Sequence, residues 1–121
     1  MSRAWWIGLG VVVLLLVVGR RPVFAAKAGT ILSTKPEIDY ARRIVSRVWQ
    51  AHGQSLVVTS GYDGTHSAQS LHYVGLAEDY RTREIAPEDV AAMAREIQAI
   101  LGSDYDVVIE PTHLHIEFDP T

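Results

Sequence analysis

The segment YDVVIEPTHLHIEFD, Tyr105 to Asp119, decides the fold of this chain. Two runs rich in Val, Ile and aromatic residues flank Pro111-Thr112, which predicts a β-hairpin that turns at this dipeptide. Side chains alternate along a strand, so the polar and the apolar residues of the second run occupy opposite faces: His113, His115 and Glu117 against Leu114, Ile116 and Phe118. The apolar face joins the core, and both imidazoles face the side that a cleft would occupy.

Two helices and two further strands are predicted before this hairpin. Thr34 and Glu37 form the spacing of a capping box, and apolar residues recur at helical spacing from there until Gly53. Pro87 opens a second helix, which Gly102 ends. The segments SLVVTS (55–60) and GLAEDYR (75–81) have strand character. Without regular βαβ alternation, this order predicts an α+β domain with two helices on one face of a small, mainly antiparallel sheet.

The N-terminal segment differs from the rest of the chain. Ala4 to Gly19 contains no charged residue, a length between that of a signal-peptide apolar region and that of a full membrane span. The small residues around Ala26-Lys27-Ala28 suit cleavage, whereas Trp5-Trp6 suit the interfacial end of a retained helix. Residues 1–21 are therefore predicted to be a hydrophobic helix serving as signal peptide or membrane anchor, 22–33 a linker and 34–121 the domain.

Composition excludes two classes of function. The sequence has no cysteine, so a transition metal would depend on His, Asp and Glu. The chain after Lys27 holds seven Lys and Arg against fourteen Asp and Glu, which is unfavourable for binding phosphate backbones. Nucleic acid is therefore not an expected partner.

A second motif, SLHYVGLAEDY, places His72 and Asp79 seven residues apart. Together with the histidines of HLH, these residues supply two imidazoles and a carboxylate. Such a set suits a catalytic zinc ion that keeps an open position for water.

These motifs carry a resemblance to a known family. SLHYVGLAED (70–79) matches the pattern SxHxxGxAxD, and EPTHLHIEF (110–118) follows it in the chain. In this order they resemble the two signatures of the D-Ala-D-Ala metallopeptidase superfamily, which includes murein endopeptidases and the zinc-binding domain of Hedgehog proteins. VTSGYDGTH (58–66) is similar to the SGYR segment of that superfamily. The resemblance covers about residues 36 to 119 and implies a Hedgehog/D,D-peptidase-like fold.

By position, the resemblance implies that His72, Asp79 and His115 bind Zn²⁺. An alternative third ligand is His113, because other branches of the superfamily use ExxH, here Glu110 and His113, with the glutamate as general base. HLHIEF resembles the HxH branches more closely, which favours His115. In the expected mechanism Glu110 takes the proton of the attacking water and His113 stabilises the tetrahedral oxyanion, and His113 is the alternative base. Glu117 is expected to hold a ligand histidine.

Three further residues are candidates for contact with substrate. Ser70 is expected to orient the loop before His72 by a hydrogen bond to backbone. His66 is expected to line the cleft. Where many relatives have Arg in SGYR, this chain has Asp63, and Arg81 is a candidate replacement for that cation; the alternative is that Arg81 is a solvated or salt-bridged surface residue.

The expected function is zinc-dependent hydrolysis of peptide bonds in peptidoglycan, by a D,D-carboxypeptidase or a murein endopeptidase. The substrate implies an extracytoplasmic position, either membrane-anchored or secreted, although Arg20-Arg21 after the apolar run favour a cytoplasmic domain by the positive-inside tendency. The alternative is a non-catalytic, zinc-stabilised module that binds cell wall or protein. Such a module has little need of Glu110 and His113.

Overall fold

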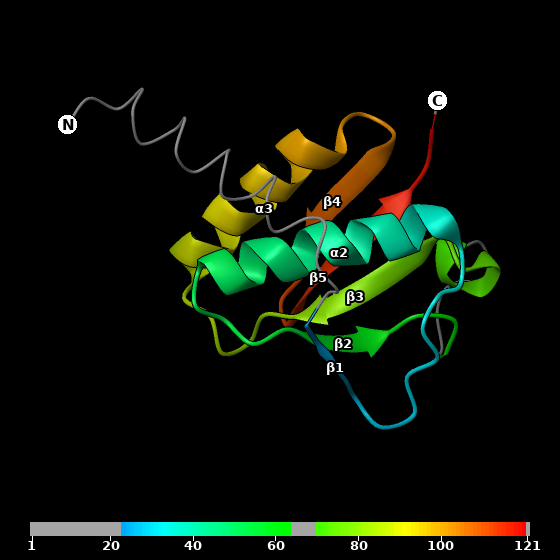
Figure 1. Ribbon diagram of the computed structural model, residues 1–121, viewed down its shortest axis with the longest axis horizontal. Helices are drawn as coiled ribbons and strands as arrows, with labels where there is room; N and C mark the ends of the chain where they lie inside the picture. Colours follow the sequence, from blue (N-terminus) through cyan, green and yellow to red (C-terminus); the bar gives the residue numbers. More distant parts are fainter. Residues whose placement is uncertain (1–22, 64–69, 121) are drawn as a thin grey trace.

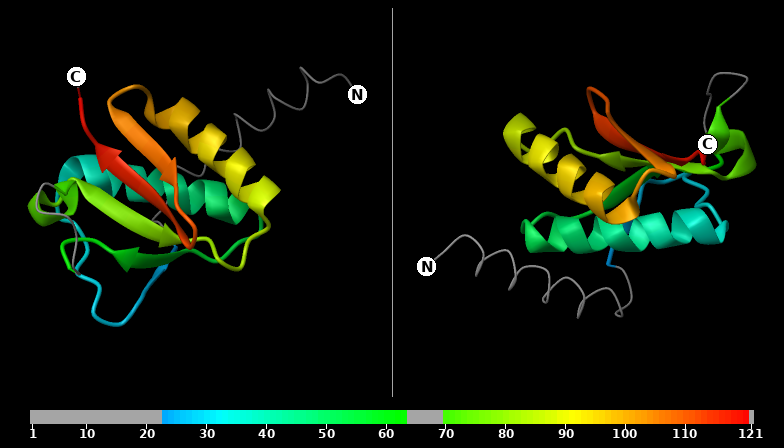
Figure 2. Two further views of the ribbon diagram at one scale, coloured as in Figure 1. Left: turned by 180° about the vertical axis from the view of Figure 1, so that it is seen from behind. Right: turned by 90° about the horizontal axis from the view of Figure 1, so that it is seen from above.

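The computed structural model describes residues 23–63 and 70–120 (Figure 1). Its strands and helices, in chain order, are β1 (Ala25–Ala26), α2 (Pro36–Ala51), β2 (Val57–Ser60), the 3-10 helix η1 (Leu71–Val74), β3 (Ala77–Arg81), α3 (Pro87–Leu101), β4 (Tyr105–Ile109) and β5 (His113–Phe118). The strands form one sheet in the order β1-β2-β3-β5-β4. Both long helices lie on the same side of this sheet (Figures 1 and 2). The predicted α+β class is confirmed.

The sheet is mainly antiparallel, as predicted, but it also contains one parallel pair and is therefore mixed. β1 pairs in parallel with β2, and the other neighbouring strands are antiparallel. β1 lies within residues 22–33, the segment predicted as a linker. Main-chain hydrogen bonds from Ala25 to Leu56 and from Lys27 to Val58 hold it in place. Two alanines carry no β-branched or alternating signal, so side-chain patterns did not indicate this strand.

The two predicted helices are present, but the capping box is wrong. α2 begins at Pro36, so its N-cap is Lys35, and no side chain caps it. Proline is favoured at the first helical position, which puts Thr34 one residue too early to cap. Its hydroxyl lies instead 3.5 Å from that of Tyr62. α3 begins at Pro87 as predicted and is followed by Gly102, whose φ is +86°.

The hydrophobic core lies between the helices and one face of the sheet. Each helix buries one apolar side, and β5 contributes Leu114 and Ile116, both fully buried. The largest buried apolar side chains from the helices are Ile38, Ile44, Trp49, Met93 and Ile97. Burial of each such side chain contributes about 1.5–3 kcal/mol to folding. The predicted assignment of the β5 faces is confirmed at these positions.

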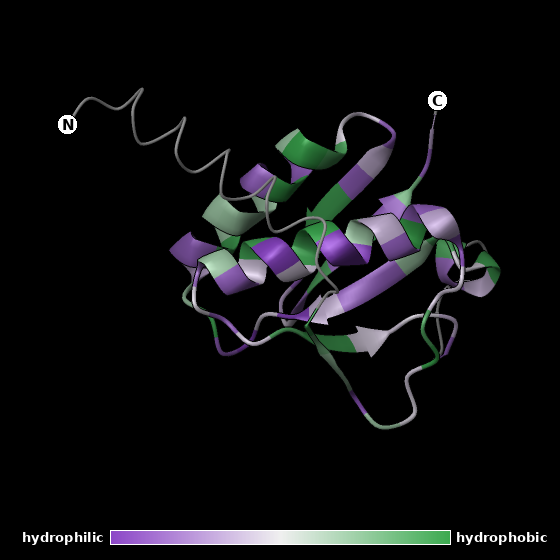
Figure 3. Cartoon of the chain, in the orientation of Figure 1, coloured by the Kyte–Doolittle hydropathy of each residue, from purple (hydrophilic) through white to green (hydrophobic). Residues whose placement is uncertain are grey.

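Neither long helix covers the other face of the sheet (Figure 2). β3 is mainly hydrophilic, in contrast to β2 (Figure 3). β5 lies between β3 and β4, so Asp79 pairs with His115 and Arg81 pairs with His113. Paired residues share a face, and the polar side chains of β3 and β5 therefore meet on this open face.

The outer edge of β4 is occupied by a side chain. Nε2 of Gln98 in α3 donates a hydrogen bond to the Tyr105 carbonyl (2.8 Å), and its Oε1 accepts one from the Val107 N–H (3.1 Å). The amide thus takes the place that a neighbouring strand would take at these two residues.

Two predictions fall outside the described residues: the signal peptide or anchor at residues 1–21, and His66. Within the part of the chain that the structure describes, no helix is long and apolar enough to cross a membrane.

Candidate metal centre

Three elements that are far apart in the sequence bring their ligand atoms to one point on the open face. His72 comes from η1, Asp79 from β3 and His115 from β5. His72 Nε2 lies 3.3 Å from His115 Nδ1 and 3.3 Å from Asp79 Oδ1. His115 Nδ1 lies 2.8 Å from the same carboxylate oxygen. These are the three ligands that the resemblance implied.

The spacing of these atoms suits a tetrahedral zinc site. Zinc binds imidazole nitrogen and carboxylate oxygen at about 2.0–2.2 Å, so two ligand atoms at a tetrahedral angle are about 3.4 Å apart. Two of the three separations are 3.3 Å, and the 2.8 Å contact of His115 with Asp79 needs a shift of only about half an ångström to match. The residues present therefore fit a zinc ion with three protein ligands.

His72 is held so that Nε2 faces this point. Its Nδ1 lies 2.8 Å from the carbonyl oxygen of Gly61 and donates to it, which leaves the lone pair on Nε2. The Ser70 hydroxyl accepts a hydrogen bond from the His72 N–H (3.2 Å), as its predicted role in orienting the loop requires. The chain then turns at Gly75, whose φ is +77° and whose Cα lies against the Tyr62 ring, so that a Cβ would collide with it.

His115 contacts a carboxylate through each ring nitrogen. Its Nε2 lies 2.8 Å from Glu117 Oε1, opposite the contact of Nδ1 with Asp79. Burial alone would lower the pKa of His115, but the two carboxylates outweigh it and raise the pKa. With a cation at the centre, Nε2–H still donates to Glu117 and Nδ1 remains to bind the ion. Glu117 thus has the contact expected of a residue that holds a metal-binding histidine.

Asp79 is the shared anion of the cluster. Only 7% of its surface is exposed. Burial would raise the pKa of the carboxyl group, but hydrogen bonds from His115 and His72 and the nearby His113 hold it well below its ordinary value. The carboxylate is therefore charged throughout the neutral range and attracts a cation.

His113 lies next to the cluster, and Glu110 lies opposite His113 across the hairpin. His113 Nε2 lies 3.7 Å from Asp79 Oδ2, farther than the three atoms that converge. The Glu110 N–H donates to the His113 carbonyl (2.9 Å), which closes the hairpin. No described residue forms a hydrogen bond or ion pair with the Glu110 carboxylate. The geometry favours His115 over His113 as third ligand.

A second buried carboxylate supports β3 from the core side. The Arg42 guanidinium in α2 donates to both oxygens of Glu78, with Nε 2.8 Å from Oε1 and Nη2 2.6 Å from Oε2. The Ser33 N–H (2.9 Å) and the Tyr80 hydroxyl (3.0 Å) donate to the same carboxylate. This network fixes β3 to α2 directly behind Asp79.

Asp63, the residue that departs from the SGYR pattern, has a structural role. Its Oδ1 accepts hydrogen bonds from the N–H groups of Ile31 (2.7 Å) and Gly61 (2.9 Å). Asp63 thereby orders the turn that contains Gly61, whose carbonyl accepts the hydrogen bond from the His72 imidazole. An arginine at position 63 has no acceptor atom for these two donors.

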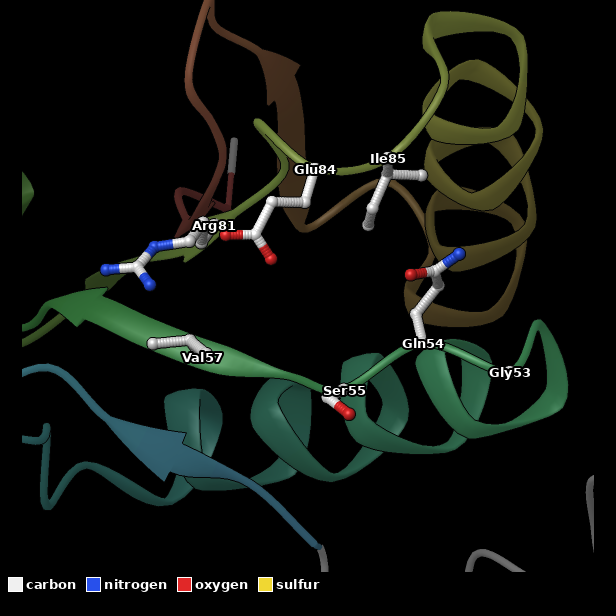
Figure 4. Close-up of a pocket in the computed structure, with 7 residues that line it drawn as sticks. All are labelled: Gly53, Gln54, Ser55, Val57, Arg81, Glu84 and Ile85. Atoms are coloured by element: carbon white, nitrogen blue, oxygen red, sulfur yellow. The ribbon is translucent and has the colours of Figure 1, made fainter.

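Arg81 lies on the open face at the carboxyl end of β3, away from the three converging atoms. It lines a hollow with residues of the α2–β2 turn and the β3–α3 connection (Figure 4). No described residue forms an ion pair with it. The structure therefore places Arg81 two residues from Asp79 and outside the ligand cluster.

Sequence reasoning missed two contributors to the site. The Gly61 carbonyl is a backbone group and has no side-chain signal. The Arg42–Glu78 pair does have a signal in the sequence, because Glu78 occupies a core-facing position of a strand and Arg42 follows Ala41 on the apolar side of a helix. A charged residue at such a position is rarely buried without a partner.

Comparisons of the chain with protein-family models, with curated proteins and with solved structures find no match.

Proposed function

We propose that this protein is a zinc-dependent peptidase of the D-Ala-D-Ala metallopeptidase superfamily with a Hedgehog/D,D-peptidase-like fold. It hydrolyses peptide bonds of peptidoglycan, as a D,D-carboxypeptidase or a murein endopeptidase. The observation that supports this most is the convergence of His72 Nε2, His115 Nδ1 and Asp79 Oδ1 on one point of the open face. Two imidazoles and one carboxylate are the ligands of many catalytic zinc sites and leave a position for substrate.

The residues beside the centre have the chemistry that peptide hydrolysis needs. When bound, zinc supplies Lewis acidity, which activates water and polarises a carbonyl group. Glu110 takes the proton of the attacking water and passes it to the leaving amine, a role that suits a carboxylate without an ion-pair partner. His113 donates a hydrogen bond to the oxygen that becomes negatively charged in the transition state.

The substrate sets the location of the protein. Peptidoglycan peptides lie outside the cytoplasmic membrane, so the proposal requires an extracytoplasmic domain. The apolar residues 4–19 supply either a membrane anchor or a secretion signal for that purpose. No nucleic-acid partner is proposed for this acidic domain.

The direct test is mass analysis of defined muropeptides after incubation with the zinc-loaded full chain, purified in detergent. Loss of one D-Ala identifies a carboxypeptidase, and splitting of a cross-linked dimer identifies an endopeptidase. A chelator abolishes either activity. Tight zinc binding without cleavage of any muropeptide would contradict the enzyme and support the alternative, a zinc-stabilised module that binds cell wall or protein.

The proposed base is tested by Glu110→Gln. This variant is expected to lose activity by at least about a hundredfold, the usual contribution of a general base, and to bind zinc as the wild type does. Glu88→Gln, in the first turn of α3, is the matched control and retains activity. Unchanged activity of Glu110→Gln would transfer the base role to His113.

A further inference from the structure

A hollow of about 180 Å³ lies beside the candidate centre, at the carboxyl end of β3. Its wall comes from three segments: Gln54 and Ser55 of the α2–β2 turn, Val57 of β2, and Arg81, Glu84 and Ile85 of the β3–α3 connection (Figure 4). The wall therefore combines a cation, an anion, two uncharged polar groups and two apolar side chains.

The two charged groups of the hollow do not neutralise each other. No described residue forms an ion pair with Arg81, and Figure 4 shows its guanidinium pointing away from Glu84. Among the described residues, the Glu84 carboxylate has one ionic neighbour, Arg83 at 3.8 Å, and both side chains of that pair are largely exposed. An exposed pair at this distance contributes little. Arg81 and Glu84 can therefore each bind the oppositely charged group of a ligand that carries both a negative and a positive charge.

The hollow is within reach of a peptide held at the centre. Asp79 and Arg81 lie on the same face of β3, two residues apart, which corresponds to about 7 Å. Arg81 is also the cross-strand partner of His113. A substrate whose scissile bond lies at the centre can therefore extend one side chain into the hollow.

We propose that the hollow is a subsite for an amino-acid head group, an ammonium and a carboxylate on one carbon, at the end of a substrate side chain. The Arg81 guanidinium binds the carboxylate in a forked pair. The Glu84 carboxylate and the Ser55 hydroxyl bind the ammonium, and Val57 and Ile85 contact the methylene groups. The inference rests on the proposed function, and in peptidoglycan the side chain with this chemistry is that of diaminopimelate.

The proposal predicts a preference between matched substrates. A stem peptide with diaminopimelate is cleaved with a kcat/KM at least about tenfold higher than the same peptide with an amidated side-chain carboxyl, because the amide forfeits a charge-assisted hydrogen bond. Arg81→Gln lowers kcat/KM for the free acid and leaves that for the amide unchanged. Arg83→Gln, an adjacent arginine outside the hollow, keeps the preference. Equal losses on both peptides, or no preference in the wild type, overturn the subsite.

A binding experiment tests the subsite without cleavage. Free meso-diaminopimelate is titrated into the isotope-labelled full chain in detergent micelles, and backbone amide shifts are followed by NMR. Shifts are expected at Gln54, Ser55 and Ile85, with binding weakened about tenfold or more in Arg81→Gln and in Glu84→Gln. Binding without cleavage of any muropeptide refutes the proposed function alone. Absence of shifts, or equal shifts with 1,5-diaminopentane, which keeps both ammonium groups and lacks both carboxylates, refutes the side-chain subsite.

Discussion

Glu78 and Asp79 are adjacent in β3, and their carboxylates lie on opposite faces of the sheet in different surroundings. Glu78 is fully buried on the core side, where Arg42, Ser33 and Tyr80 supply four hydrogen bonds. Asp79 on the open face is contacted by imidazoles. The first carboxylate receives its cation from the chain itself, whereas the second has neighbours that are cationic only when protonated.

The Glu78 ion pair is therefore structural, whereas the surroundings of Asp79 suit the binding of a ligand. A guanidinium is always charged, so Glu78 has a permanent cationic partner within the fold. The imidazoles around Asp79 can give up their protons, and their nitrogens then converge on an ion. The core side of β3 thus carries the permanent Arg42–Glu78 ion pair. The open side carries Asp79 with imidazoles whose protons a metal ion can replace.

Removal of the fixed cation is expected to have the largest effect. Arg42→Met leaves Glu78 buried and charged without its partner, which destabilises the protein by about 3–5 kcal/mol. Urea unfolding of the metal-free full chain in detergent measures this change, with Arg43→Met, on the exposed side of α2, as control. A loss below about 1 kcal/mol would mean that the buried pair contributes no more than a surface pair.

Removal of the exchangeable site should instead remove the stability that zinc adds. At a zinc concentration a hundred times its Kd, the wild type gains about 2.7 kcal/mol against unfolding. Asp79→Asn loses this gain, and without metal it loses only the contribution of the contacts that hold the pKa of Asp79 low. Parallel urea titrations with zinc and with chelator distinguish the two contributions. Equal zinc stabilisation of both proteins would place the metal elsewhere.

The contact of Glu117 with His115 allows a test of whether Glu117 contributes to zinc affinity through this histidine. Glu117→Gln weakens the acceptor for Nε2–H and is expected to lower zinc affinity about 10–100-fold while the fold persists. Competition with a chelating dye measures this affinity. Asp106→Asn is the control, because Asp106 is the cross-strand partner of Glu117 and forms no hydrogen bond or ion pair with any histidine that the structure describes. Equal losses of zinc affinity in the two variants would mean that Glu117 acts only through its negative charge and not through its hydrogen bond with His115.

The smallest expected effect is the dependence of metal affinity on pH. The pKa of His115 is raised above its ordinary 6.5, so its protonated form stabilises the metal-free protein below pH 6.5, and this contribution is lost as pH rises through the raised pKa. Zinc needs the deprotonated ring, and its affinity falls by up to about tenfold per unit as pH drops below that pKa. The measurement is a zinc titration from pH 8 to pH 5.5. A flat profile would show that His115 is not a ligand.

The sequence predicted which side chains of β5 lie on each face of the sheet, but it did not predict the order of the strands. Alternation along β5 correctly separated Leu114 and Ile116 from the histidines, and the resemblance of the two motifs to a known family implied His72, Asp79 and His115. The order of the strands was not accessible, because either strand of the hairpin can pair with β3, and only β5 beside β3 brings His115 to Asp79. β1 and the Gly61 carbonyl depend on main-chain hydrogen bonds, which have no side-chain pattern.

The amide of Gln98 restricts how an extended peptide can approach. At Tyr105 and Val107 it already satisfies the groups that an added strand would use, so β4 does not accept a guest strand there. Gln98 thus opposes backbone pairing at these two groups of the β4 edge. The same blockade opposes edge-to-edge association of two copies, which favours solubility at high concentration.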